Sequence, residues 1–257
     1  MQPPVAFPFD HDRWVKPIAL PVGQPGGSAT AFNLPQRMVL PYITAPAALT
    51  SLEIRMKLYF FQQSRATRIR WMLEELGVPY ELALVDMMKG EHKHPDYLKV
   101  HPMGSLPAIE DNGVNLFESA AILMYLADKY PEKRLAPAVG TPERGEYYQW
   151  ILFAMTEAEA PLATIAQHTR FLPEVERSPV VIERSSKRFK AVAAVLEARM
   201  KGREYIVGNS FTAADVVLGG VLFLASRVGQ LGDDLPTLRA YFDRLMARPA
   251  AKKGYGG

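Results

Sequence analysis

The stretch from Leu106 to Ser119 constrains the fold of this chain more than any other part of the sequence. Residues 106–109 (Leu-Pro-Ala-Ile) predict a short buried strand with a proline at its head, where the missing N–H of proline does not interrupt a ladder. The Asp-Asn-Gly sequence at 111–113 predicts a tight turn into a second strand over 114–117. A helix is expected to begin directly after that strand, so the stretch predicts a β-hairpin that leads into a helix.

The same stretch predicts a binding site for an extended, peptide-like ligand. Leu106 precedes a proline, which favours extended geometry and leaves its N–H and C=O free to pair with such a ligand. Ser119 lies near a helix N-terminus, which favours an anion, and Glu118 supplies a carboxylate for a cation. These groups suit the two charged ends of an amino acid. The alternative interpretation is that Glu118 and Ser119 only cap the helix.

Composition narrows the class of protein. The chain has 257 residues, of which 48% are apolar, enough for one large or two ordinary domains. Its 30 basic and 27 acidic residues are interspersed, so the net charge of +3 does not predict a nucleic-acid partner. No apolar run approaches the roughly 18 residues of a membrane span. The absence of cysteine excludes disulfides, thiolate metal sites and a cysteine nucleophile.

Residues 1–55 differ from the rest of the chain. Nine of the 21 prolines fall there, and the apolar residues between them follow neither a helical nor an alternating pattern. We therefore expect a disordered, proline-rich extension. Prolines and charges interrupt the apolar core that a secretory signal needs, and the segment lacks the composition of an organelle transit peptide. We therefore expect a cytoplasmic protein.

From Met56 onward the order of elements predicts two domains. The first, over 56–134, reads as a βαβ unit followed by a ββα unit. Its first helix repeats apolar residues at one face and ends at Gly77. The second domain, over 141–251, carries helical periodicity without strand signals and is expected to be all helical. Within it, Thr212 and Asp215 predict a capping box with a structural role.

Residues 56–130 resemble the N-terminal, thioredoxin-like domain of cytosolic glutathione transferases, and the segment after them, to about Pro249, resembles the all-helical C-terminal domain of that family. The residues that carry the resemblance are 56–61, 64–68, 71–80, 90–92, 106–109, 118–119 and 211–215. The resemblance implies a detoxifying, homodimeric transferase with glutathione as cosubstrate, of the serine type found in theta- and delta-like bacterial members. Relatives often begin near the position of Met56, so we expect an over-extended start.

The resemblance implies that Ser64 is catalytic. The thiol of glutathione has a pKa near 8.5 in water, and a hydroxyl at the start of a helix can stabilise its thiolate. A shift of two pKa units needs about 2.7 kcal/mol, within reach of one charge-assisted hydrogen bond and a helix end. Arg68 follows Ser64 at the spacing of serine-type members. The alternatives are that Ser64 is only an N-cap, or that Tyr59 is the catalytic hydroxyl.

The remaining site residues also follow from the resemblance. His92 is expected to contact the glycine carboxylate of glutathione, whereas Gly104 departs from the basic or histidine residue common in the family. Leu106, Pro107, Glu118 and Ser119 are expected to hold the rest of the tripeptide.

The second substrate is expected between the two domains. Its candidate contacts are Tyr148, Phe153 and Thr156, although aromatic residues at helical spacing more often belong to the core. We expect no metal, because His92 and His94 do not share a helix face and no further ligands accompany them. Two alternative functions stay open. The chain could be a glutathione-dependent peroxidase or disulfide reductase, or it could be a noncatalytic protein that binds glutathione.

Overall fold

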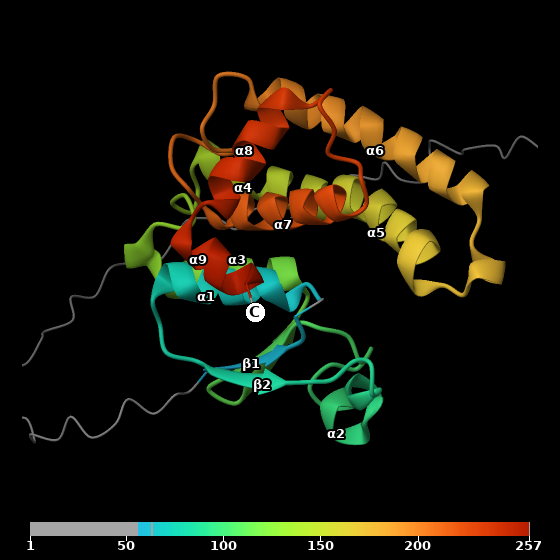
Figure 1. Cartoon of the computed structure of the whole chain (residues 1–257). Coiled ribbons are helices and arrows are strands. Elements are labelled where there is room, and N and C mark those ends of the chain that lie inside the picture. The colour runs from blue at the N-terminus through green and yellow to red at the C-terminus, as the bar shows by residue number, and fades with distance from the viewer. Residues whose placement is uncertain (1–55, 63, 257) are drawn as a thin grey trace, which may run out of the picture. The chain divides into compact units, whose positions relative to one another are not determined.

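The computed structural model describes residues 56–62 and 64–256 (Figure 1). The disorder predicted for residues 1–55 lies outside the described residues. Four strands form one mixed sheet in the order β2-β1-β3-β4, in which β1 pairs parallel with β2 and antiparallel with β3. The elements of this half are β1 (Met56–Phe60), α1 (Ala66–Leu76), β2 (Glu81–Leu84), α2 (Pro95–Leu98), β3 (Ala108–Asp111), β4 (Val114–Phe117) and α3 (Ser119–Lys129).

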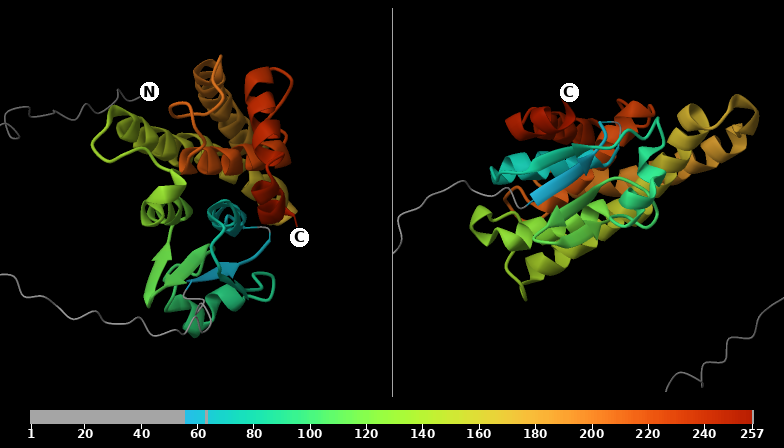
Figure 2. Two further views of the ribbon diagram at one scale, coloured as in Figure 1. Left: turned by 90° about the vertical axis from the view of Figure 1, so that its left-hand side faces the viewer. Right: turned by 90° about the horizontal axis from the view of Figure 1, so that it is seen from below.

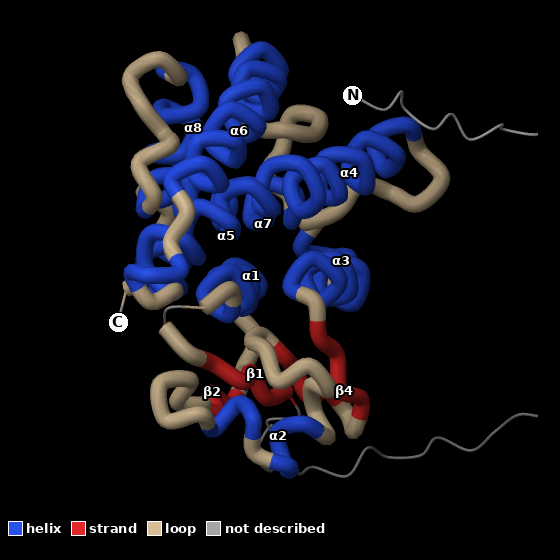
Figure 3. The backbone as a smooth tube through the Cα atoms, turned by 90° about the vertical axis from the view of Figure 1, so that its right-hand side faces the viewer, coloured by secondary structure: helices blue, strands red, loops and turns tan. Residues whose placement is uncertain are grey.

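The rest of the described chain is helical, as the sequence predicts. Its elements are α4 (Pro142–Phe153), the π-helical turn η4 (Ala154–Glu159), α5 (Ala160–Ala166), η5 (Gln167–Phe171), α6 (Pro179–Met200), α7 (Ala213–Arg227), α8 (Pro236–Met246) and α9 (Pro249–Tyr255). Figures 2 and 3 show α1 and α3 between the sheet and these helices, with α2 on the other face of the sheet. No helix among the described residues is long and apolar enough to cross a membrane. The predicted fold class, a thioredoxin-like domain followed by an all-helical domain, is confirmed.

Helix α1 is buried on two sides. Ile69, Met72 and Leu76 are fully buried on the predicted apolar face. Trp71 is also fully buried, and its ring lies 6.0 Å from that of Phe211, which immediately precedes the cap of α7. Because the sheet and the helical domain both need this helix to complete their cores, α1 joins the two halves of the molecule.

The predicted capping box is present at the start of α7. The Asp215 carboxylate accepts a hydrogen bond from the Thr212 backbone N–H at 2.8 Å, and both reciprocal bonds of the box are made. Its other oxygen accepts from the Ile206 N–H at 3.0 Å and from the Tyr241 hydroxyl at 2.7 Å. Asp215 is fully buried and every oxygen has a partner, so its role is structural.

A buried ion pair crosses from α1 to the helical domain. Arg68 is 3% exposed and donates from Nη2 to Glu159 Oε2 at 2.7 Å, while Arg65 donates to the other carboxylate oxygen. Burial acts to raise the pKa of Glu159, but the attraction of Arg68 and then Arg65 outweighs it and leaves that pKa lowered. The carboxylate therefore stays charged inside the molecule.

The last helix, α9, packs closely on α1, and we expect this approach to require Gly254. A Cβ on Gly254 would lie 2.8 Å from both the backbone N and the Cβ of Trp71. The backbone of α1 would have to shift to relieve this contact. Gly254→Ala should lower the free energy of unfolding by about 1–3 kcal/mol in urea titrations. Gly145 is the matched control, because it lies exposed in α4 with nothing within 4 Å of an added Cβ. Gly145→Ala should raise stability by up to about 1 kcal/mol; equal stability of the two variants would contradict the close approach.

The ion pair gives a second stability prediction. Glu159→Gln leaves the buried Arg68 charge without its counter-charge and should cost about 3–5 kcal/mol at pH 7, measured by urea unfolding. Because the pKa of Glu159 is lowered from 4.5, its stabilising contribution is present above that pH and is lost as the pH falls through the folded value. The difference between wild type and variant should therefore shrink below about pH 4.5.

Glu183→Gln is the control for that measurement. Its side chain is exposed and pairs with Lys187 four residues later on α6, so its loss should cost about 0.5 kcal/mol or less. A Glu159→Gln variant no less stable than Glu183→Gln, or a difference from wild type that stays constant with pH, would count against a charged Glu159.

Candidate functional site

Ser64 lies in the turn between β1 and α1 and is half-buried. Its hydroxyl donates to the Phe61 carbonyl at 2.7 Å and accepts from the Ala66 N–H at 3.1 Å. The oxygen therefore satisfies one free donor of the first turn of α1, although the N-cap position itself is occupied by Arg65, whose side chain makes no capping bond. To donate to a bound thiolate, the hydroxyl hydrogen has to turn away from Phe61. The same oxygen can go on accepting from Ala66 when that happens.

The Arg68 side chain is buried between α1, the start of α3 and η4. One terminal nitrogen contacts Ser119 Oγ at 3.3 Å and Met155 Sδ at 3.4 Å, and the other binds Glu159. A single guanidinium thus links the start of α1 to the start of α3. Sequence reasoning found the spacing of Ser64 and Arg68 but missed Glu159, because no motif surrounds it.

The Leu106–Pro107 segment approaches the start of α3 from the sheet. The peptide bond between the two residues is cis, and both side chains are buried. Within the described residues, the N–H and C=O of Leu106 have no backbone partner. Ser105 is held by the Tyr97 hydroxyl, which donates to its carbonyl at 2.6 Å. An extended ligand can therefore pair with the backbone of Leu106, as the sequence predicts.

Glu118 and Ser119 lie where α3 begins. Ser119 is its first residue and is 3% exposed, with its hydroxyl next to Arg68. Glu118 is exposed and has φ 68°, ψ 108°, a conformation that non-glycine residues rarely adopt. Such a backbone costs of order 1–3 kcal/mol and is found mostly at binding and catalytic sites. The Glu118 side chain is exposed at this turn, directly before the buried Ser119.

His92 lies in a short 3-10 turn, η2 (Glu91–Lys93), and its buried Nδ1 has no partner among the described residues. The His92 carbonyl lies against Gly104, where an added Cβ would approach it to 2.4 Å and where φ is +55°. A side chain at residue 104 would be both crowded and strained, so this backbone requires glycine. Lys93 fastens this loop by donating to the carbonyls of Met103 and Gly104 at 2.9 and 3.2 Å.

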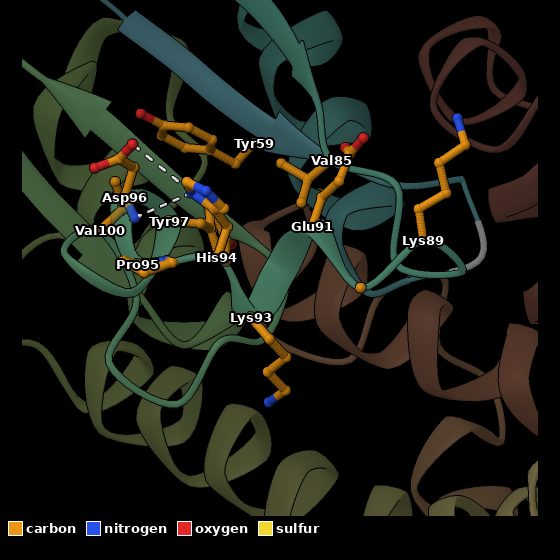
Figure 4. A pocket seen from close by; sticks show the side chains of 11 residues that line it. Tyr59, Val85, Lys89, Glu91, Lys93, His94, Pro95, Asp96, Tyr97 and Val100 are labelled. Atoms are coloured by element: carbon orange, nitrogen blue, oxygen red, sulfur yellow. Dashed lines mark hydrogen bonds and ion pairs between the residues drawn. The ribbon is translucent and has the colours of Figure 1, made fainter.

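Tyr59 lies on the other face of the sheet, away from α1. It borders an open hollow of about 690 Å³ between the ends of β1 and β2 and the segment from η2 to α2 (Figure 4). Its ring meets that of Tyr97 edge-on at 5.4 Å, and its hydroxyl lies 3.4 Å from a Glu110 oxygen. Burial, and then Glu110, raise the pKa of Tyr59. A phenol in this setting is a weaker hydrogen-bond donor to a thiolate than an unperturbed one.

The residues predicted for the second substrate lie on α4 and η4. Tyr148 is 41% exposed, with the Arg144 guanidinium 4.9 Å from its ring centre. Thr156 is exposed and donates to the Leu152 carbonyl at 3.0 Å. Phe153 is half-buried, and its ring packs edge-on against that of Trp150, with 5.4 Å between the ring centres. This contact agrees with the alternative that Phe153 belongs to the core. The described residues contain no cluster of three or more His, Asp or Glu side chains that could hold a metal ion.

Comparison with known proteins gives the family. Residues 54–128 match the family model of the glutathione S-transferase N-terminal domain, and residues 149–249 match that of the C-terminal domain. Glutathione S-transferase F9 of Arabidopsis thaliana is 33% identical over 192 residues, which cover 70% of this chain and 87% of the relative. Glutathione S-transferase 2 of Schizosaccharomyces pombe is also 33% identical, over 200 residues and 85% of its length.

Solved structures agree with the sequence relatives. The glutathione transferase URE2P6 of Phanerochaete chrysosporium, in complex with oxidized glutathione, is 31% identical with a TM-score of 0.73, over 79% of this chain and 96% of that one. A glutathione transferase of Burkholderia graminis, with two glutathione molecules bound per subunit, is 29% identical with a TM-score of 0.71, over 79% and 88% of the two chains. With both domains, their order and the fold in agreement, this chain belongs to the glutathione S-transferase family.

Proposed function

We propose that this transferase is of the serine type expected from the theta- and delta-like resemblance, with Ser64 as the residue that stabilises the thiolate of glutathione. One observation carries the proposal: the Ser64 hydroxyl lies at the first turn of α1, and Arg68 of the same helix reaches the start of α3, where Glu118 and Ser119 lie. The groups needed for the thiol and for the γ-glutamyl end of glutathione are thus joined by one buried side chain.

Glutathione lies along the edge formed by these residues in the proposed complex. Leu106 pairs with the tripeptide backbone, and Pro107 shapes the turn that presents it. Glu118 binds the ammonium group, and the N-terminus of α3 at Ser119 binds the adjoining carboxylate. His92 binds the glycine carboxylate at the far end. Each contact thus matches either the charge or the hydrogen-bonding groups of the part of glutathione that it would receive.

The reaction needs a thiolate near neutral pH. The thiol loses its proton to solvent, and the sulfur is then held by the Ser64 hydroxyl and the positive end of α1. The sulfur forms a bond to an electrophilic carbon of a small, mainly apolar substrate that lies against Tyr148 and Thr156, with Phe153 behind them. The leaving group departs with the electron pair of its bond to that carbon. We also propose a cytoplasmic homodimer, with domains over 56–134 and 141–251.

A Ser64→Ala substitution tests the catalytic role. It should lower kcat with glutathione and 1-chloro-2,4-dinitrobenzene about 100-fold, while KM for glutathione changes less than about threefold, because two pKa units of thiolate stabilisation are lost. The pH profile of kcat should move upward by about two units. Tyr59→Phe is the matched control and should retain turnover. Equal losses in both variants, or unchanged turnover in Ser64→Ala, would remove Ser64 from the proposed role.

A second candidate activity is reduction of peroxides or disulfides by bound glutathione. It is favoured by the oxidized glutathione found in structurally similar transferases, and this chain has no cysteine of its own to take part. Two glutathione molecules would reduce one organic hydroperoxide to an alcohol and water and leave as glutathione disulfide. Assays with an aryl halide, an organic hydroperoxide and hydroxyethyl disulfide side by side should show the highest kcat/KM with the halide. A hydroperoxide or disulfide preferred by tenfold or more would reverse that order.

A further inference from the structure

Arg65 is the residue directly after Ser64, and its side chain is 45% exposed. It immediately precedes the first residue of α1. Its guanidinium turns towards the helical domain, where Nε donates to Glu159 Oε1. Among the residues that the structure describes, Glu159 is its sole side-chain partner. A cation that solvent can reach therefore belongs to the residue next to the proposed catalytic serine.

The charges around Arg65 do not cancel. Glu159 is 4% exposed and divides its two oxygens between Arg65 and the buried Arg68. One negative charge thus faces two positive charges. Because an unpaired charge is most costly when it is buried, Glu159 neutralises Arg68 first. The net positive charge of the cluster resides on its exposed member, Arg65. An anion that approached from solvent would complete the pairing.

The position of Arg65 is also fixed. Because its Nε is bonded to Glu159, the guanidinium plane is held while the two terminal nitrogens remain available to a ligand in a fork that matches a carboxylate. Glu159 ends the same π-helical turn that carries the exposed Thr156, one of the residues predicted for the second substrate. The carboxylate that holds Arg65 and one residue predicted for the second substrate therefore belong to the same short segment, η4.

We propose that Arg65 recognises a carboxylate on the electrophilic substrate, so that carboxylate-bearing acceptors are the class this enzyme prefers. The inference rests on the proposed function, since it places the acceptor beside Ser64. Glutathione also carries carboxylates, but the proposed site already gives each of them a partner, at His92 and at the start of α3. Arg65 is then left for the acceptor.

A pair of matched acceptors tests the proposal: 4-chloro-3-nitrobenzoate and its methyl ester. In both, the thiolate sulfur forms a bond to the ring carbon that carries chlorine, and chloride leaves with the bonding electron pair. The acid and the ester differ in charge at the position opposite the leaving group. The measured quantity is kcat/KM for the acid divided by kcat/KM for the ester, which removes any general loss of activity from the comparison.

Arg65→Gln should lower this acid-to-ester ratio about tenfold, the effect of losing one charge-assisted hydrogen bond. Arg65→Lys keeps the charge without the fork and should lower it less than about threefold. Arg70→Gln removes another partly buried guanidinium from α1 and should leave the ratio within about twofold of wild type. Added salt should lower the wild-type ratio and have little effect on that of Arg65→Gln.

Other outcomes overturn the inference and can be told apart from failure of the proposed function. Equal losses with acid and ester in Arg65→Gln would make Arg65 a structural residue only. A rise in KM for glutathione with an unchanged acid-to-ester ratio would assign Arg65 to glutathione. If the acid-to-ester ratio fell equally in Arg70→Gln, the preference for the acid would come from the overall positive charge of the protein and not from Arg65. If wild type transferred glutathione to neither acceptor nor to 1-chloro-2,4-dinitrobenzene, the proposed function itself would fail.

Discussion

The buried pairing of Arg68 with Glu159 is the interaction on which the rest of the site depends. A guanidinium inside a protein has to keep its counter-charge, and here the counter-charge comes from the other domain. The same guanidinium contacts Ser119, so the starts of α1 and α3 cannot shift independently of η4. The thioredoxin-like half supplies the proposed glutathione contacts, but the helical half, through Glu159 and Arg68, holds Ser119 in place.

Local sequence patterns predicted most of the fold because their causes are local. The apolar face of α1, its end at Gly77 and the capping box at Thr212 each depend on residues within one or two turns. The hairpin after Pro107 likewise follows from its turn residues, and β3 and β4 pair as expected. Together these signals, added to the family resemblance, were sufficient for the order of elements and the fold class.

The candidate site was only partly accessible from sequence. Ser64, Glu118 and Ser119 stand in motifs, and their placement at two helix starts could be predicted. Glu159 could not, because it reaches α1 through a π-helical turn and across a domain boundary, neither of which leaves a local signal. Phe153 shows the converse, since an aromatic residue at helical spacing looks the same in sequence whether it lines a site or, as here, packs on Trp150.

The close packing of α9 on α1 has a consequence for how the chain is made. Gly254 lies against the backbone of Trp71, and Gln62, two residues before Ser64, donates to the Tyr255 carbonyl at 2.6 Å. The first described helix is therefore covered by the last one. During synthesis from the N-terminus, the side of α1 that packs on α9 stays uncovered until α9 has left the ribosome. The surroundings of Ser64 are therefore completed only once α9 has been made and has packed on α1.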